Sequence, residues 1–128
     1  MSAPPLSESK TLAVIACEIW RLKKYYESNK DSLPIPVRHS IRKLYELLTG
    51  QDVTFIDREE KEFDPGLNFD VLAVEEDDFL PEGSIIIKKT IKPIILLKEK
   101  VLMAGEVILA RGIKNDKRKE REENDLRD

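Results

Sequence analysis

Residues 63–111 constrain the fold most, because short apolar runs alternate with turn signals along this whole stretch. Valine and isoleucine dominate the runs, and the triplets D-P-G (64–66), P-E-G (81–83) and K-E-K (98–100) separate them. Such runs, bounded by turns, are typical of short antiparallel strands. Pro93 is expected on an edge or at a break because it has no amide hydrogen to donate. Gly105 is expected at a bulge or a point of close approach.

The preceding residues follow a helical pattern instead. Apolar residues recur at spacings of three and four, which predicts two amphipathic helices. Leu33-Pro-Ile-Pro separates the helices, because a proline disfavours helix at the residue before it. Gly50 is a natural C-terminal stop for the second helix. Together these signals predict a helical hairpin.

The first helix is apolar over more of its circumference than one neighbour covers. A second copy of the hairpin would cover it and complete a four-helix bundle, so we expect a homodimer. The alternative is that the β domain of the same chain covers this stripe. The expected dimer interface is Leu12, Ile15, Ile19, Leu22, Ile41, Leu44 and Leu48.

The predicted fold class is therefore α+β, with a helical hairpin followed by a small all-β domain. We expect a helical dimerisation region at residues 1–50, a β domain at residues 51–112 and a charged, disordered tail at residues 113–128. The acidic run at residues 75–78 is expected in a loop before the turn at 81–83.

Composition argues against several classes of function. The net charge is −3, without the basic excess of proteins that bind nucleic acids or membranes. The chain has one histidine, His39, and one cysteine, Cys17, which excludes zinc sites and histidine-based triads. We expect no cofactor, no metal and no enzymatic activity. The first residues do not resemble a signal peptide, and Cys17 suits a reducing compartment, so we expect a cytoplasmic protein.

Five lysines make the predicted β domain locally basic. They form either a docking surface for an acidic partner or a charged edge that blocks strand-to-strand aggregation. The sequence leaves both readings open. These lysines are Lys88, Lys89, Lys92, Lys98 and Lys100.

The order of these parts resembles the C-terminal two-thirds of the GrpE family, the nucleotide-exchange factors of DnaK-type chaperones. Residues 63–71 read F-D-P-G-L-N-F-D-V, which is similar to the family phrase F-D-P-x-x-H-E-A-V. Residues 99–107 read E-K-V-L-M-A-G-E-V, which is similar to D-R-V-L-R-P-A-x-V. The chain departs from these phrases at Asn68 and Met103, and Pro93 stands where K-G-Y is expected. It also lacks the long paired helix with which family members begin.

The resemblance implies a homodimeric co-chaperone of protein folding and the stress response. One β wing would bind the ATPase domain of a DnaK-type chaperone, favour its open cleft and release ADP. The implied partner contacts are Lys100 at the hairpin tip, with Ile91 and Leu109 on neighbouring strands. Gly50 would join helix to wing through its C-cap geometry, while Asp64 and Pro65 would shape a turn.

A second interpretation keeps the GrpE-like fold but assigns it another use. The altered phrases and the missing helix favour a scaffold or adaptor without exchange activity. A β module that binds nucleic acid through its lysines is a weaker alternative, because the chain lacks an aromatic stacking platform.

Overall fold

The computed structural model describes residues 8–113, so the predicted tail at 113–128, apart from Ile113, lies outside the described residues. The chain separates into two compact units. The helical unit comprises Met1–Ile56 and Pro93–Ala104, and the sheet unit comprises Asp57–Lys92 and Gly105–Asp128. The predicted division at residue 50 is therefore not the one that the structure shows. Within residues 8–113, two helices and two small sheets place the chain in the α+β class.

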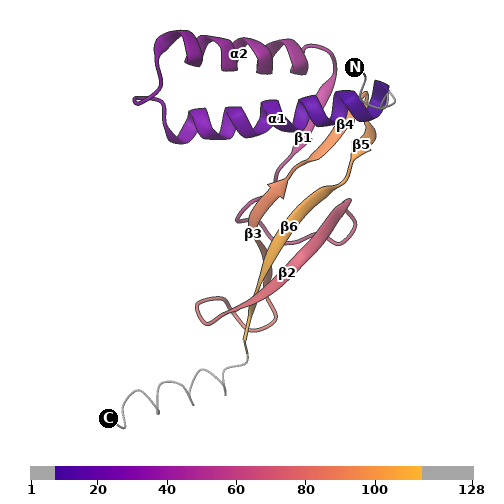
Figure 1. Ribbon diagram of the computed structural model, residues 1–128. Helices are drawn as coiled ribbons and strands as arrows, with labels where there is room; N and C mark the ends of the chain where they lie inside the picture. The colour runs from indigo at the N-terminus through magenta and orange to yellow at the C-terminus, as the bar shows by residue number, and fades with distance from the viewer. Residues whose placement is uncertain (1–7, 114–128) are drawn as a thin grey trace, which may run out of the picture. The chain divides into compact units, whose positions relative to one another are not determined.

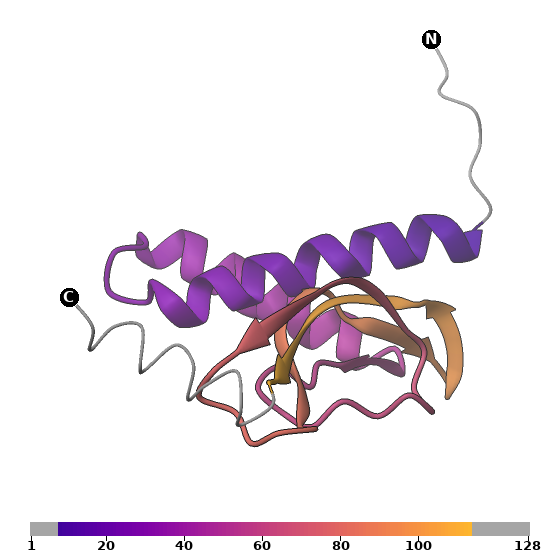
Figure 2. The same cartoon turned by 90° about the horizontal axis from the view of Figure 1, so that it is seen from below.

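The helical unit begins with the two predicted helices, α1 (Glu8–Ser28) and α2 (Ile35–Thr49), which lie side by side in Figure 1 and Figure 2. Pro36 lies in the first turn of α2, where its missing amide hydrogen removes no helical bond. α2 ends directly before Gly50, as predicted, although Gly50 has φ −67° and does not adopt the left-handed conformation common at helix ends. The left-handed conformation falls instead on Asp52, with φ 63°.

An antiparallel sheet completes the helical unit. Its strands are β1 (Val53–Ile56), β4 (Ile94–Leu97) and β5 (Lys100–Met103), with β4 in the centre. Both helices contact this sheet, α1 through β4 and β5 and α2 through β1. The core between them is Ala16, Cys17, Ile19, Leu48, Val53 and Ile95. This shared core explains why β1, β4 and β5 group with the helices and not with the other strands.

The sheet unit holds β2 (Phe69–Asp77), β3 (Ile85–Lys92) and β6 (Gly105–Gly112), with β6 in the centre (Figure 1). β3 pairs with β6 in the antiparallel sense, but β2 pairs with β6 in parallel. The expectation of an entirely antiparallel β domain is therefore wrong. Turn signals predict hairpins between consecutive strands, whereas β2 and β3 both pair with a strand much later in the chain.

Two proline and glycine signals have the expected consequences. Pro93 separates β3 from β4, so the predicted break is confirmed. Gly105 lies against the ring of Phe69, and a Cβ atom there would lie 2.5 Å from Cδ1 of that ring. The predicted close approach is thus confirmed. The acidic run differs from its prediction, because Glu75, Glu76 and Asp77 continue β2 and pair with β6.

Candidate partner-binding surfaces

The turn between β4 and β5 is the predicted hairpin tip. Lys98 and Glu99 are its two central residues, with φ 49° and 69°, and Leu97 pairs with Lys100 across it. Two central residues with positive φ form a type I′ turn, which usually contains asparagine and glycine. The Lys98 amide also donates to the Asp52 carbonyl at 3.0 Å. Three non-glycine residues with positive φ are thus brought together at one end of this sheet.

Charged side chains surround this turn. Asp52, Thr54, Lys98 and Glu99 line an open hollow beside it. Lys100 begins β5 and is exposed. The surface therefore presents both ammonium and carboxylate groups. Pairing between β4 and β5 holds the backbone that carries them in place, so the surface suits a charged partner.

The other two implied contacts belong to the sheet unit. Ile91 is half-buried in β3. Leu109 is only 4% exposed, since it lies opposite the fully buried Ile87 in the centre of the sheet. The Leu109 side chain is therefore part of the core of this unit and offers no surface to a partner. Burial of this kind follows from sheet pairing, which the local sequence does not reveal.

The predicted dimer residues separate into two groups. Ile19, Ile41 and Leu48 are buried within the chain, and Leu12 is half-buried. The remaining three are exposed, at 49% for Ile15, 44% for Leu22 and 43% for Leu44. Ile19 and Leu48 thus pack against strand residues of the same chain, as the alternative interpretation expected. Other predicted dimer residues stay exposed.

Further exposed apolar side chains on the same helices were missing from the prediction. Ile15 and Leu22 lie seven residues apart, as do Val37 and Leu44, so each pair lies on one face of its helix. We call the exposed apolar residues that share these faces of α1 and α2 the helical stripe. They are Val14, Ile15, Leu22, Tyr25, Val37, Leu44 and Leu47. Apolar side chains that stay exposed on two neighbouring helices suit an interaction site.

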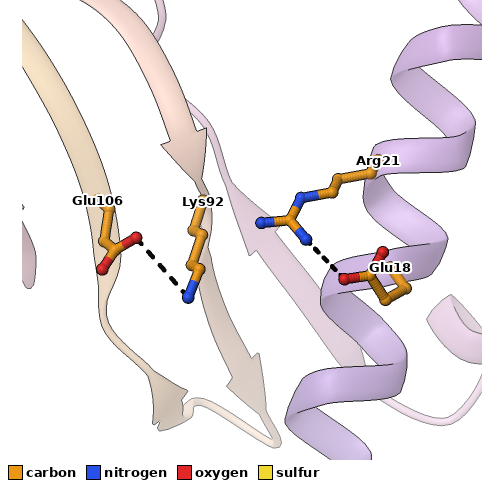
Figure 3. A network of polar contacts seen from close by, with 4 residues as sticks. All are labelled: Glu18, Arg21, Lys92 and Glu106. Atoms are coloured by element: carbon orange, nitrogen blue, oxygen red, sulfur yellow. Dashed lines mark hydrogen bonds and ion pairs between the residues drawn. The ribbon is translucent and has the colours of Figure 1, made fainter.

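Polar and aromatic contacts link elements of the helical unit. Arg21 Nη1 lies 2.5 Å from Glu18 Oε1 on α1 (Figure 3). The Lys23 ammonium lies 5.1 Å from the ring centroid of Tyr45 on α2, which links the two helices by a cation–π contact. Burial, and then the Glu27 carboxylate, raise the pKa of the Tyr45 phenol. The Tyr45 ring also stacks on Phe55 at a centroid distance of 5.7 Å, so it joins α2 to β1.

Ion pairs cross the strands of the sheet unit. Lys92 Nζ lies 3.7 Å from Glu106 Oε1, between β3 and β6 (Figure 3). Lys88 on β3 donates to Glu75 on β2, and this hydrogen bond raises the pKa of the Lys88 ammonium. Two of the five lysines thus neutralise carboxylates of their own sheet, which reduces the basic character predicted for this region.

In two turns of the sheet unit, an aspartate side chain accepts a hydrogen bond from a backbone amide. The Gly66 amide donates to Asp64 Oδ1 at 2.8 Å, and the Leu67 amide donates to the Asp64 carbonyl at 3.1 Å, with Pro65 between them. The Phe79 amide donates in the same way to Asp77 Oδ1 at 2.8 Å. Phe79 is 96% exposed, and its position was not foreseen. The sequence feature that could have identified this position is an aromatic residue directly after an acidic run.

Within residues 8–113, no group of histidine, cysteine, aspartate and glutamate side chains is arranged to hold a metal ion. Neither of the two described helices is long and apolar enough to cross a membrane. No known protein-family model matches this chain, and no curated protein sequence matches it. The surfaces described above are therefore the basis for a functional proposal.

Proposed function

We propose that this protein is a GrpE-like co-chaperone, a homodimer that binds the ATPase domain of a DnaK-type chaperone and promotes ADP release. One observation carries the proposal. A two-helix hairpin with an uncovered apolar stripe is followed by six short strands, and one hairpin between these strands presents a lysine at its tip. The phrases at residues 63–71 and 99–107 add to this support. The proposed location is the cytoplasm, where a single buried thiol such as Cys17 stays reduced.

Dimerisation through the helical stripe accounts for its exposure. Side chains such as Leu22 and Leu44 remain more than two-fifths exposed in the single chain. Burial of apolar surface contributes roughly 25 cal/mol per Å², so a second hairpin packed on this stripe is favoured. The partner hairpin would complete the four-helix bundle expected from the sequence.

Sedimentation velocity tests this part of the proposal. Leu22→Lys and Leu44→Lys introduce charges into the helical stripe without disturbing the core, since both positions are exposed. We expect these variants to sediment as monomers and the parent protein as a dimer. Ile85→Lys, at an exposed apolar position of the sheet unit, is the matched control and should remain dimeric. A monomeric parent protein would contradict the proposed assembly.

Exchange requires no catalytic group. A protein that binds the open ATPase cleft better than the closed one shifts the chaperone toward the open state, which loses ADP. About 1.4 kcal/mol of preferential binding shifts this equilibrium tenfold. The Lys100 ammonium, at the β4–β5 turn, is the residue through which we expect the contact to be made.

The test is ADP release from a DnaK-type chaperone loaded with a fluorescent ADP analogue. We expect many-fold acceleration at micromolar protein, and a decrease of about fivefold for Lys100→Glu because the contact charge is reversed. Lys61→Glu makes the same charge change on an exposed loop and should leave the rate unchanged. If Lys100→Glu and Lys61→Glu behave alike, the assignment of the hairpin tip is wrong.

A second candidate is the same assembly acting as an adaptor without exchange activity. The burial of Leu109 favours it, because one of three implied partner contacts is lost to the core. A folded, dimeric protein that does not accelerate ADP release would support the adaptor function and refute exchange.

A further inference from the structure

A cluster of basic side chains lies on one face of α2. Arg38 and Arg42 are four residues apart, so they project from the same side of the helix. His39 and Lys43 have the same spacing one position further along. In the part of the chain that the structure describes, no carboxylate forms an ion pair with Arg38, Arg42 or Lys43. The positive charge of this cluster is therefore available to a ligand.

The cluster lines two open hollows of the helical unit. The smaller hollow, of about 190 Å³, takes one lining residue from the last turn of α1 and four from α2; they are Tyr26, Ile35, Arg38, His39 and Arg42. The larger hollow, of about 370 Å³, is lined by His39, Ser40, Arg42, Lys43 and Glu46. The Glu46 carboxylate thus lines the larger hollow only. The smaller hollow has two guanidinium groups and no acidic side chain among its lining residues.

One guanidinium group of the smaller hollow has an unsatisfied hydrogen-bond donor. The Nε atom of Arg38 is buried and makes no hydrogen bond. A guanidinium group stays charged at all ordinary pH values and has only donors, and a buried donor without an acceptor destabilises the folded protein. Because the Arg38 side chain lines the smaller hollow, an anion bound there would supply acceptors to this group.

The position of these cations is unfavourable for α2 itself. Like charges four residues apart on a helix repel each other, as Arg38 and Arg42 do. The amino end of a helix has a partial positive charge, which nearby cations increase. α2 has no acidic residue in its first turn and no side-chain cap at Pro34. A helix face that only contacts water gains nothing from this arrangement, whereas a bound anion is attracted by both the side chains and the helix dipole.

The charge around the smaller hollow suits a compact anion with more than one negative charge. The Lys30 ammonium lies 5.8 Å from the ring centroid of Tyr26, which is one wall of the hollow. This ammonium adds to the charge of the two arginines. A phosphate monoester has a charge of about −1.5 to −2 at pH 7 and three acceptor oxygens. The planar fork of a guanidinium group matches these oxygens with two parallel hydrogen bonds.

We propose that the smaller hollow binds a phosphate monoester group. Arg38 and Arg42 donate to its oxygens, and the His39 imidazole supplies a further donor. The group belongs either to a phosphorylated side chain of a partner protein or to a small phosphorylated molecule, since both present the same chemistry. Consecutive residues of a helix are about 100° apart, so Leu44 of the helical stripe lies on a different face from Arg42. The site uses none of the residues assigned to the proposed exchange function.

The probes are inorganic phosphate and a capped pentapeptide with one phosphoserine between glycines, each titrated into the full chain. Chemical shifts of backbone amides and of arginine Nε–H groups locate the contact. We expect saturable shifts at residues 35–43 and at Arg38 Nε–H with at least one probe, and the tighter probe identifies the source of the group. A peptide with glutamate in place of phosphoserine should bind at least about fivefold more weakly than the phosphoserine peptide, because it has less charge and fewer acceptors. Equal binding of the glutamate peptide, absence of binding by both probes, or shifts confined to other elements would overturn the proposal.

Matched variants separate this site from general charge attraction. Arg38→Gln with Arg42→Gln should weaken the tighter probe at least about tenfold, because hydrogen bonds to two charged groups are lost. Lys61→Gln with Lys89→Gln removes the same charge from exposed positions of the sheet unit and should leave the affinity unchanged. Arg38→Lys with Arg42→Lys keeps the charge but lacks the planar fork, so the affinity should fall by about threefold. Trp20 emission should match the parent in all three variants, which shows that the helical unit is folded. If both glutamine variants weaken binding equally, or neither does, the proposal fails.

Discussion

The strained turn between β4 and β5 allows a sharp prediction. Lys98 and Glu99 adopt φ values of 49° and 69°. Asparagine and glycine are the residues that a type I′ turn favours, because they tolerate positive φ. Lys98→Asn combined with Glu99→Gly should therefore stabilise the helical unit without altering the register of the hairpin.

The magnitude follows from two opposing effects. A left-handed conformation costs an ordinary L-residue about 1–2 kcal/mol, and the double variant relieves most of this cost at two positions. Glycine loses more chain entropy on folding, which takes back roughly 0.5–1 kcal/mol. Two positions with most of this cost relieved, less the glycine cost, leave an expected net gain of about 1–3 kcal/mol in the free energy of unfolding. For a unit of this size, each kcal/mol corresponds to an increase in Tm of about 4–8 °C.

Urea unfolding monitored by tryptophan fluorescence is the suitable assay. Trp20 is the single tryptophan of the chain and is buried in the helical unit. Its emission therefore reports the unfolding of the unit that contains the turn. The free energy of unfolding of parent and variant is compared at 25 °C, together with the urea dependence, which should not change.

A matched variant provides the control. Lys98→Val with Glu99→Val places β-branched residues at positive φ and should destabilise the same unit. If the asparagine–glycine variant were no more stable than the parent, or the double valine variant equally stable, the backbone assigned to this turn would be wrong.

Three further predictions concern the two cores. Gly112→Ala should destabilise the sheet unit by about 3 kcal/mol, because its Cβ atom would lie 1.9 Å from the Pro81 carbonyl oxygen; amide hydrogen exchange in β6 measures this, and unchanged protection would contradict it. Leu109→Ala should cost about 2–5 kcal/mol by the same measurement, as expected for a buried leucine, and a loss below 1 kcal/mol would place this side chain at the surface. The pKa of the Tyr45 phenol is higher in the folded protein than in the unfolded chain. The part of the folding free energy that depends on the neutral phenol is therefore fully present below about pH 10, the ordinary pKa of tyrosine, and is lost as pH rises through the folded-state pKa. Tyr45→Phe should flatten this part of the Trp20-monitored stability profile, and an identical profile would show that another group is responsible.

Local signals placed most of the elements. The helical spacing predicted α1 and α2, and the prolines between them predicted the break that separates these helices. Pro93 ended β3, and Gly105 marked a close approach to Phe69. These features depend on the sterics of one residue and its neighbours in the chain, so the sequence contains the information needed to find them.

The candidate surfaces were predicted less completely. Lys100 was placed at the hairpin tip by the short K-E-K triplet, and it lies there, beside the turn. Leu22 and Leu44 are exposed as a dimer contact requires, whereas Ile41 and Leu48 are buried within the chain. Helical periodicity identifies the apolar side of a helix, but it does not say which part of that side another segment of the chain covers.

Strand pairing was decided only in three dimensions. Alternation along β2 is compatible with any neighbouring strand, and the turn signals after it favoured an antiparallel pair with β3. Both strands instead pair with β6, which buries Leu109 and leaves the edge of β2 open. The reason is physical: backbone hydrogen bonds carry no residue identity, so the choice of partner depends on which arrangement buries the apolar faces of the whole chain.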